Sequence, residues 1–364
     1  MKRKLLTVDD NMFFDNKNLF VGIDVHKIKW VVTIRTYDLL LKSFSMSPSA
    51  EALEKYLISN YPNAKFSIVY ESCFSGFWIY DYFSEKGYKI IVTPTNRIYK
   101  DGSAIKTDII DSRKLAFQLS RELLREVKVP DKKIREYKYI FRIYDKQKMR
   151  KGQILRQIKA MLEQKNHPLK WERWNNALIE KLKGLKFENT LFNRKFSNLL
   201  KEYEFVISQI KDSESIIEQI SEDESLERRI KTIENINGIG IISAVRICIY
   251  LFDRKDRFEN SEKLNHYLGL TPSERSSGEK VIRGKSGLYG NKQLRTIIIQ
   301  LAWIAVRKDG ALLDKFERVY KKSGSKQKAI VAVARKLMTK IYAVINKEEE
   351  YKINYDGIKT VKAA

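Results

Sequence analysis

The chain has 364 residues, more than one typical hydrophobic core accommodates, so its length predicts two or three domains. Hydrophobic residues make up 43% and aromatic residues 11%, which excludes a globally disordered chain. The 70 Lys and Arg against 45 Asp and Glu give a formal net charge of +25, which favours nucleic acid, and next an anionic membrane surface, as partner over a merely solvated basic surface.

Cysteine usage and hydropathy indicate the compartment. Two cysteines and three histidines argue against a disulfide framework or a Cys/His zinc site and fit a reducing cytosol. The first residues are basic but acquire acids where a signal peptide would need an apolar stretch, and no run approaches the roughly 18 apolar residues of a membrane span. We therefore expect a soluble, cytoplasmic protein without a membrane partner.

After an N-terminal tail (1–18), residues 19–128 predict an α/β domain. The segment 19–35, LFVGIDVHKIKWVVTIR, is typical of a strand pair or one long bent strand. The following elements alternate along the chain: helices at 49–61 and 76–87, strands at 65–72 and 88–94, and a helix that begins near Asp108.

Residues 129–228 have a different character. Gly and Pro are almost absent, and charged residues interleave with apolar ones at helical spacing. The pattern predicts two long helices, 144–164 and 198–220, interrupted at 166–176. We expect an extended helical hairpin or coiled coil, although its heptads are too irregular to fix the oligomeric state.

Residues 229–345 predict a third, mainly helical domain, followed by a weakly ordered tail (346–364). Gly238 and Gly240 precede an apolar helix; these glycines either present backbone amides to phosphate or permit close helix packing. The other expected elements are a short helix at 262–272, a loop rich in Ser, Gly and basic residues at 273–291, and helices at 292–308 and 326–345.

Four acids of the α/β domain are candidate metal ligands. Asp24 lies inside the apolar strand VGIDVHK, where a charge is costly unless something binds it, and Glu71 ends the strand SIVYE. Asp108 and Asp111 share one helix face, so the four carboxylates could converge and hold Mg²⁺ for phosphoryl transfer. Each acid also has an ordinary explanation, such as helix capping for Asp108 or a strand end for Glu71.

A serine-rich stretch, SERSSGEK, offers Ser276 and Ser277 ahead of Gly278. Serine attacks a phosphodiester only if it loses its proton and the phosphate charge is offset. Basic neighbours supply the second condition, but His266 is the nearest histidine. From the residues alone, a phosphate-gripping loop without a nucleophile is favoured.

Basic residues predicted to contact nucleic acid fall into two main groups, which would position the phosphate backbone without reading sequence. The predicted contacts are Lys146, Lys148, Arg150, Lys151, Arg156 and Lys159 on the first long helix, and Arg275, Lys280, Arg283, Lys285 and Arg295 in and after the serine loop. A solvated helix face is the alternative.

The ordered set GIDVHK, YES, IVTPTNR with IKTDIIDSRKLA, INGIG and YLGLTPSERSSGEKVIRGKSGLYGNKQLR resembles the Piv-like DEDD transposases of bridge-RNA-guided insertion sequences, the IS110 group, over about residues 19–345. The resemblance implies an RNase H-like (RuvC-like) domain whose quartet Asp24, Glu71, Asp108 and Asp111 binds Mg²⁺ or Mn²⁺. Ser112 departs from the family, which more often has Ala there.

The resemblance also implies a function. The serine before the glycine of the SG motif, Ser277 with Ser276 as the alternative, would become covalently joined to DNA during strand exchange. Expected partners are DNA at element ends and target, a structured guide RNA, and further copies of the chain in a dimer or tetramer; expected localisation is cytoplasmic and nucleoid-associated. Two readings stay open beside it: a metal-dependent junction endonuclease without a covalent intermediate, and a non-catalytic nucleic-acid-binding protein.

Overall fold

The structure is a computed structural model. It describes residues 14–94, 107–169, 174–254, 256–277, 280–286, 290–349 and 351–353, with the backbone alone for 273–277 and 280–286. The chain divides into two compact units, Met1–Val129 and Pro130–Ala364. Within the described ranges, no helix combines the length and apolar character that crossing a membrane requires.

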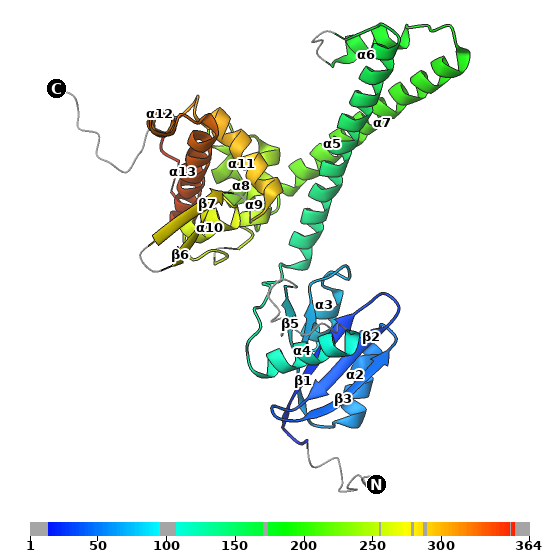
Figure 1. Cartoon of the computed structure of the whole chain (residues 1–364), viewed down its shortest axis with the longest axis vertical. Coiled ribbons are helices and arrows are strands. Elements are labelled where there is room, and N and C mark those ends of the chain that lie inside the picture. Colours follow the sequence, from blue (N-terminus) through cyan, green and yellow to red (C-terminus); the bar gives the residue numbers. More distant parts are fainter. Residues whose placement is uncertain are drawn as a thin grey trace, which may run out of the picture. The chain divides into compact units, whose positions relative to one another are not determined.

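The first unit is built on a five-stranded mixed sheet (Figure 1). In spatial order its strands are β3 (Leu40–Met46), β2 (Trp30–Arg35), β1 (Asn18–Val25), β4 (Lys65–Glu71) and β5 (Lys89–Thr93). β1 pairs antiparallel with β2 and parallel with β4, and β4 pairs parallel with β5. Of the two alternatives for residues 19–35, the strand pair is confirmed and the single bent strand is excluded. The mixed sheet with its helices is consistent with an RNase H-like domain.

The sequence pattern misses β3, which pairs antiparallel with β2 at the edge of the sheet. Its residues are exposed or half-buried, and Lys42, Ser43 and Ser45 interrupt the apolar ones. An edge strand with one open side needs fewer apolar residues, so its signal in the sequence is weak.

Helices cover both faces of the sheet: α2 (Ala50–Asn60) and α3 (Trp78–Glu85) on one side and α4 (Asp108–Ser120) on the other. Alternate residues of a strand point to opposite faces. Accordingly, Ile23 is fully buried with Leu53 of α2 and Phe83 of α3. Val69, of opposite parity on β4, packs with Leu115 of α4. The acidic end of α4 is thereby held over a single face of the sheet.

A chain of hydroxyl groups fastens α4 to β2 and β3. Arg113 Nε donates to Ser43 Oγ at 3.0 Å, the hydroxyls of Ser43 and Thr33 lie 3.0 Å apart, and those of Thr33 and Ser112 lie 2.8 Å apart. Ser112 Oγ then donates to the carbonyl of Ile109 at 3.0 Å. Thr33 and Ser112 are fully buried, so these bonds satisfy groups that would otherwise be costly. Ser112, where the resemblance leads us to expect alanine more often, thus has a hydrogen-bond partner in Thr33.

The second unit begins with a long helical hairpin formed by α5 (Lys132–Gln164), α6 (Asn176–Lys183) and α7 (Thr190–Ile220) (Figure 1). α5 and α7 are antiparallel, because Tyr137 bonds to Asp223 and Tyr144 bonds to Glu214, nearer the middle of α7. The two long helices predicted here are confirmed, and both begin earlier in the chain than the pattern indicates. Their apolar residues join the core of the remaining helices in one cluster.

The rest of this unit is mainly helical. Its helices are α8 (Glu227–Glu234), α9 (Ile241–Leu251), α10 (Ser261–Tyr267), α11 (Lys292–Ala305), α12 (Gly310–Ser323) and α13 (Lys326–Lys347). The helices expected after Gly240 and at 262–272, 292–308 and 326–345 are confirmed, whereas α12 escapes the pattern. α12 buries only Ala311 and Leu312, so its apolar stripe is narrow.

The prediction of a loop at 273–291 is wrong for most of this segment. The backbone forms an antiparallel hairpin of β6 (Pro272–Ser277) and β7 (Lys280–Ser286), in which Ser277 pairs with Lys280. In the sequence, two residues, of which the first is Gly, separate Ser277 from Lys280, and this spacing is typical of a β-hairpin. The polar composition of the flanking residues obscures that signal.

The surroundings of Gly238 show which of the two explanations for the glycines of the INGIG turn applies to this residue. Its φ is +97°, and a Cβ there would lie 2.6 Å from Ile304 Cγ2 on α11. A side chain would therefore meet both an unfavourable backbone conformation and a packed neighbour. Close packing accounts for this glycine.

A buried ion pair ties α5 to α9. Arg246 Nη1 and Nη2 donate to the two carboxylate oxygens of Asp145 at 3.0 and 2.8 Å, and only 6% of the Arg246 side chain is exposed. Gln293 of α11 donates to the same carboxylate. The bidentate geometry orients all three helices relative to one another.

Lys138 of α5 predicts a pH dependence of stability. Burial lowers its pKa from 10.5 to about 8, although Asp253, 3.6 Å away, opposes the shift. Below pH 8 the lysine is charged in both states; at higher pH only the folded state releases the proton, so stability rises. Between pH 7 and 9.5 the wild type should gain about 2 kcal/mol relative to Lys138→Met in urea unfolding. Parallel curves for the two proteins would contradict this prediction.

Candidate metal centre

Two of the predicted acids lie at the carboxyl ends of neighbouring parallel strands. The last registered pair between β1 and β4 is Ile23 with Tyr70, and Asp24 and Glu71 follow directly. Ile23 and Tyr70 belong to the core beneath α2 and α3. Because side chains alternate, Asp24 and Glu71 are directed to the opposite face, which α4 covers.

The first turn of α4 brings the other two acids to this edge. Thr107 caps the helix, its hydroxyl accepting a bond from the Ile110 amide, and Asp108 and Asp111 follow in the first turn. α4 contacts β1 closely at Gly22: a Cβ there would lie 2.4 Å from the Ser112 carbonyl oxygen and 2.5 Å from the Ala116 nitrogen. The absence of a side chain at Gly22 thus permits the approach that places the helix end beside Asp24.

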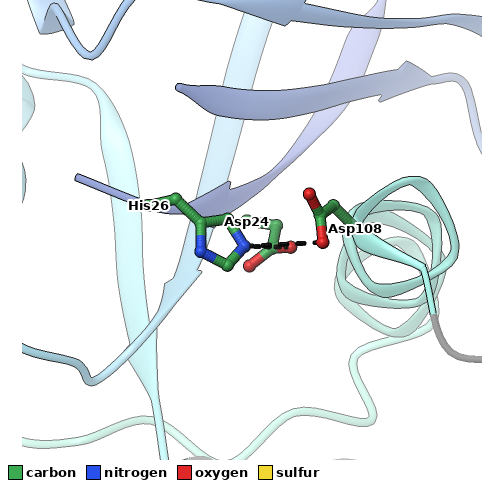
Figure 2. A group of neighbouring side chains, drawn as sticks. All are labelled: Asp24, His26 and Asp108. Carbon is green, nitrogen blue, oxygen red and sulfur yellow. Dashed lines mark hydrogen bonds and ion pairs between the residues drawn. The ribbon is translucent and has the colours of Figure 1, made fainter. Parts of the chain in front are cut away.

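Three side chains converge at this point (Figure 2). His26 Nε2 lies 3.2 Å from Asp24 Oδ2 and 3.6 Å from Asp108 Oδ1. Asp24, His26 and Asp108 each offer one possible metal-ligand atom, and these three atoms all lie within 4.8 Å of one another. Lys29 Nζ lies 3.1 Å from Asp108 Oδ2. Figure 2 shows Asp108 on the helix side of the group and His26 on the strand side, with the Asp24 carboxylate between them and interactions from the imidazole to both carboxylates.

The electrostatics of the two aspartates differ. Burial raises the pKa of Asp24 above the usual range of an aspartate; His26 opposes this, and the charges of Asp108 and Asp111 add to it. The hydrogen bond from Lys29 holds the pKa of Asp108 below its usual range. Asp24 is therefore a desolvated carboxylate among like charges, whose charged form a cation would stabilise.

These residues fit a divalent cation. Carboxylate oxygens are the ligands that Mg²⁺ and Mn²⁺ prefer, and an imidazole nitrogen suits Mn²⁺ better than Mg²⁺. Asp24 and Asp108 already share His26 as a polar partner, and Asp108 also attracts the ammonium group of Lys29. His26 is half-exposed, so a ligand or solvent can reach the group.

The structure thus brings Asp24 and Asp108 together and holds Asp111 near enough to influence Asp24. Among the described residues, Glu71 and Asp111 are not members of the group of converging ligand atoms. His26 and Lys29 were missed as site residues. The sequence carried a signal for them, since both follow Asp24 within one short connection between two strands.

The predicted serine lies in the second unit. Ser276 and Ser277 are the last residues of β6, and their side chains are outside the description, as are those of Arg275, Lys280, Arg283 and Lys285. His266 is the histidine nearest to the serines in sequence, and its Nδ1 lies 3.3 Å from the Thr271 hydroxyl oxygen.

The predicted basic residues of α5 are mostly exposed: Lys146, Lys148, Arg156 and Lys159 lie on the surface, and Lys151 is half-buried. Arg150 is exposed but bonds through two nitrogens to Glu202 of α7, so that its charge is neutralised within the hairpin. Arg295 is half-buried on α11. Their roles in nucleic-acid binding remain predictions.

Comparison with known proteins shows to which family the chain belongs. Residues 21–167 match the family DEDD_Tnp_IS110, described as a transposase, and residues 230–317 match the family described as transposase IS116/IS110/IS902. A putative transposase, y4qE, of Sinorhizobium fredii is 25% identical over 298 residues, covering 79% of this chain and 72% of that protein. The chain is an IS110-family transposase.

Other relatives of this transposase match over a shorter span. A pilin gene-inverting protein of Moraxella lacunata is 30% identical over 125 residues, and the transposase for insertion sequence element IS1111A of Coxiella burnetii is 28% identical over 124 residues. These matches cover 38% and 34% of the two relatives. The cluster at Asp24 and Asp108 lies within the matched DEDD region, as the family name leads one to expect.

Proposed function

We propose that this transposase cuts and rejoins DNA strands with divalent metal, Mg²⁺ or Mn²⁺, held by Asp24 and Asp108, with Glu71 and Asp111 completing the quartet. The observation that carries the proposal is the convergence of Asp24, His26 and Asp108 at the carboxyl edge of the sheet. A bound divalent ion would offset phosphate charge and activate the attacking oxygen. His26 is proposed as a further, imidazole ligand.

The protein's own groups have distinct roles in this proposal. The carboxylates of Asp24 and Asp108 hold the cation, and Asp111 increases the negative potential at Asp24. Lys29 orients Asp108 through its 3.1 Å contact and is placed to contact a phosphate once a cation takes over that carboxylate. β1 and α4 are packed elements, so the two aspartates are held on a rigid frame.

The nucleophile is proposed to be Ser277, with Ser276 as the alternative, joined to DNA through a phosphodiester during strand exchange. Support comes from the SSG sequence, its resemblance to the family motif, and the four basic residues around it. The hydroxyl oxygen would form a bond to phosphorus while the 3′ or 5′ oxygen of the cut strand leaves with a proton. A structured RNA from the element is proposed as guide, and a dimer or tetramer as the active assembly.

The test is a search for the serine–DNA ester. Purified protein, Mg²⁺ and labelled element-end DNA, with and without the element's transcript, should give a protein–DNA adduct that survives denaturation. Ser277→Ala should abolish the adduct and strand exchange because no hydroxyl remains to attack, while nucleic-acid binding persists. Ser273→Ala, four residues away in the same strand, is the matched control and should form the adduct.

Three results would contradict the proposed function or part of it. An adduct that persists when Ser276 and Ser277 are both alanine excludes the serine mechanism. Metal-dependent cleavage without any adduct, indifferent to both serines, identifies a hydrolytic junction endonuclease. Unchanged activity in Asp24→Asn would leave only a nucleic-acid-binding role for the acidic domain.

A further inference from the structure

A basic and aromatic surface begins one turn beyond the metal-site carboxylates and runs along α4. Arg113, Phe117 and Arg121 follow at intervals of four residues and therefore lie on one side of the helix. Arg35, the last residue of β2, and Tyr37, in the connection from β2 to β3, extend this surface: Arg35 contacts the Phe117 ring and Arg121 contacts the Tyr37 ring. We call these five residues the α4 stripe.

Cations and rings interleave along the α4 stripe. The guanidinium carbon of Arg35 lies 4.8 Å from the centre of the Phe117 ring, and that of Arg121 lies 3.6 Å from the centre of the Tyr37 ring. Tyr37 is 53% exposed and Phe117 43% exposed, although both are large apolar side chains. An exposed ring with one edge or face held by arginine keeps surface available for stacking.

The arginine charges of the stripe are not neutralised by their partners. Arg113 donates to the Ser43 hydroxyl, and Arg35 donates to the backbone carbonyls of Thr36 and Tyr37. Arg121 has an acidic partner in Asp38, but the contact is 3.7 Å and the Asp38 side chain is 79% exposed. An exposed pair of this length contributes little. Within the part of the chain that the structure describes, the three arginines thus have one acidic partner, the weakly held Asp38.

Two guanidinium groups of like charge also lie close together. Burial lowers the pKa of Arg35, and the neighbouring Arg121 lowers it further. Repulsion of this kind is relieved when a polyanion binds. The surface is therefore preorganised for phosphate, since the arginines are already held by bonds to Ser43 and to backbone carbonyls.

We propose that the α4 stripe binds a single-stranded segment of nucleic acid and leads it to the metal centre. The arginines would contact phosphates, and Tyr37 and Phe117 would stack on bases, which only an unpaired strand exposes. With about 1.5 Å per residue, the helix extends about 20 Å from Asp108 to Arg121, long enough for several nucleotides. Delivery of the strand to the metal centre rests on the proposed function, whereas binding of the strand to the α4 stripe requires neither metal nor serine.

A contact between copies of the chain is the competing occupant of this surface. A two-fold symmetric contact would place the α4 stripe against itself, so that arginines would face arginines. The formal net charge of +25 further disfavours a basic partner surface. Nucleic acid satisfies both the charge and the exposed rings.

The experiment measures binding of the full-length protein to a fluorescent single-stranded 20-nucleotide DNA, and to RNA of the same sequence, by anisotropy in EDTA over a range of KCl. R113Q/R121Q should reduce the slope of log Kd against log salt by about 1.4, because two phosphate contacts are lost. Y37A/F117A should weaken binding at least about fivefold while leaving the slope unchanged. The DNA and RNA arms show which strand the stripe takes.

The matched control is K42A/K55A. It also removes two positive charges, but Lys42 lies over the Tyr56 ring of α2, and Lys55 is on α2, on the opposite face of the sheet. Its salt slope should stay at the wild-type value. D24N should also bind the strand normally in EDTA, so that failure of the metal mechanism and failure of the α4 stripe give different results.

Two results would overturn the proposal. One is an equal, small change in slope for R113Q/R121Q and K42A/K55A. The other is wild-type strand binding by both stripe variants together with a changed mass in light scattering, which would assign the surface to a contact between copies. Thermal unfolding of each variant shows that it is folded, and R113K/R121K, which keeps the charges, should retain the wild-type slope.

Discussion

Gly22→Ala is expected to lower the free energy of unfolding by about 3 kcal/mol and to weaken Mn²⁺ binding at the same time. The added methyl group would lie 2.4 Å from the Ser112 carbonyl oxygen and 2.5 Å from the Ala116 nitrogen, both backbone atoms of α4. Backbone atoms of a helix move only with the whole helix. α4 must shift away from β1 and take Asp108 away from Asp24.

Unfolding in urea followed by circular dichroism, and Mn²⁺ binding followed by electron paramagnetic resonance, measure the two effects. Gly152→Ala is the matched control. Gly152 lies inside α5, where the nearest atom to an added Cβ is the end of the flexible Arg156 side chain at 3.5 Å. This change should stabilise the protein by up to about 1 kcal/mol. A Gly22→Ala protein as stable and as metal-competent as the wild type would show that the close approach is unnecessary.

Asp24→Asn is expected to abolish strand exchange and to remove the stabilisation that Mn²⁺ gives the wild type, without lowering stability in the absence of metal. Asp24 is desolvated and lies near the like charges of Asp108 and Asp111, so a neutral amide relieves repulsion in the metal-free protein. Metal at one hundred times its Kd should stabilise the wild type by about 2.7 kcal/mol, and the variant by much less.

Thermal unfolding with and without Mn²⁺ provides the readout. The matched control is Glu51→Gln, the same change of acid to amide at an exposed position on α2, where Lys55 is its partner. This variant should keep the full metal-induced shift. If Asp24→Asn showed the wild-type shift, the ion would bind elsewhere, and the assignment of Asp24 as a ligand would be wrong.

Much of the first unit was predictable because its signals are local. Apolar residues on both sides of Asp24 and ahead of Glu71 indicate strands, and an apolar run at helical spacing indicates the helix that begins near Asp108. These patterns depend on the neighbours of each residue along the chain. The β6–β7 hairpin and β3 were missed for the same reason, since their polar residues gave no clear apolar period.

The secondary structure around the acids and the four candidate ligands follow from the amino-acid sequence, because periodicity and motif order are properties of the chain. Which of these ligands converge depends on folding: Asp108 is 84 residues from Asp24, and the two meet because Gly22 lets α4 lie directly on β1. The same packing brings His26 and Lys29 to the carboxylates and lays the α4 stripe beside them. Contacts between distant segments depend on how faces fit together in three dimensions, which local pattern does not encode.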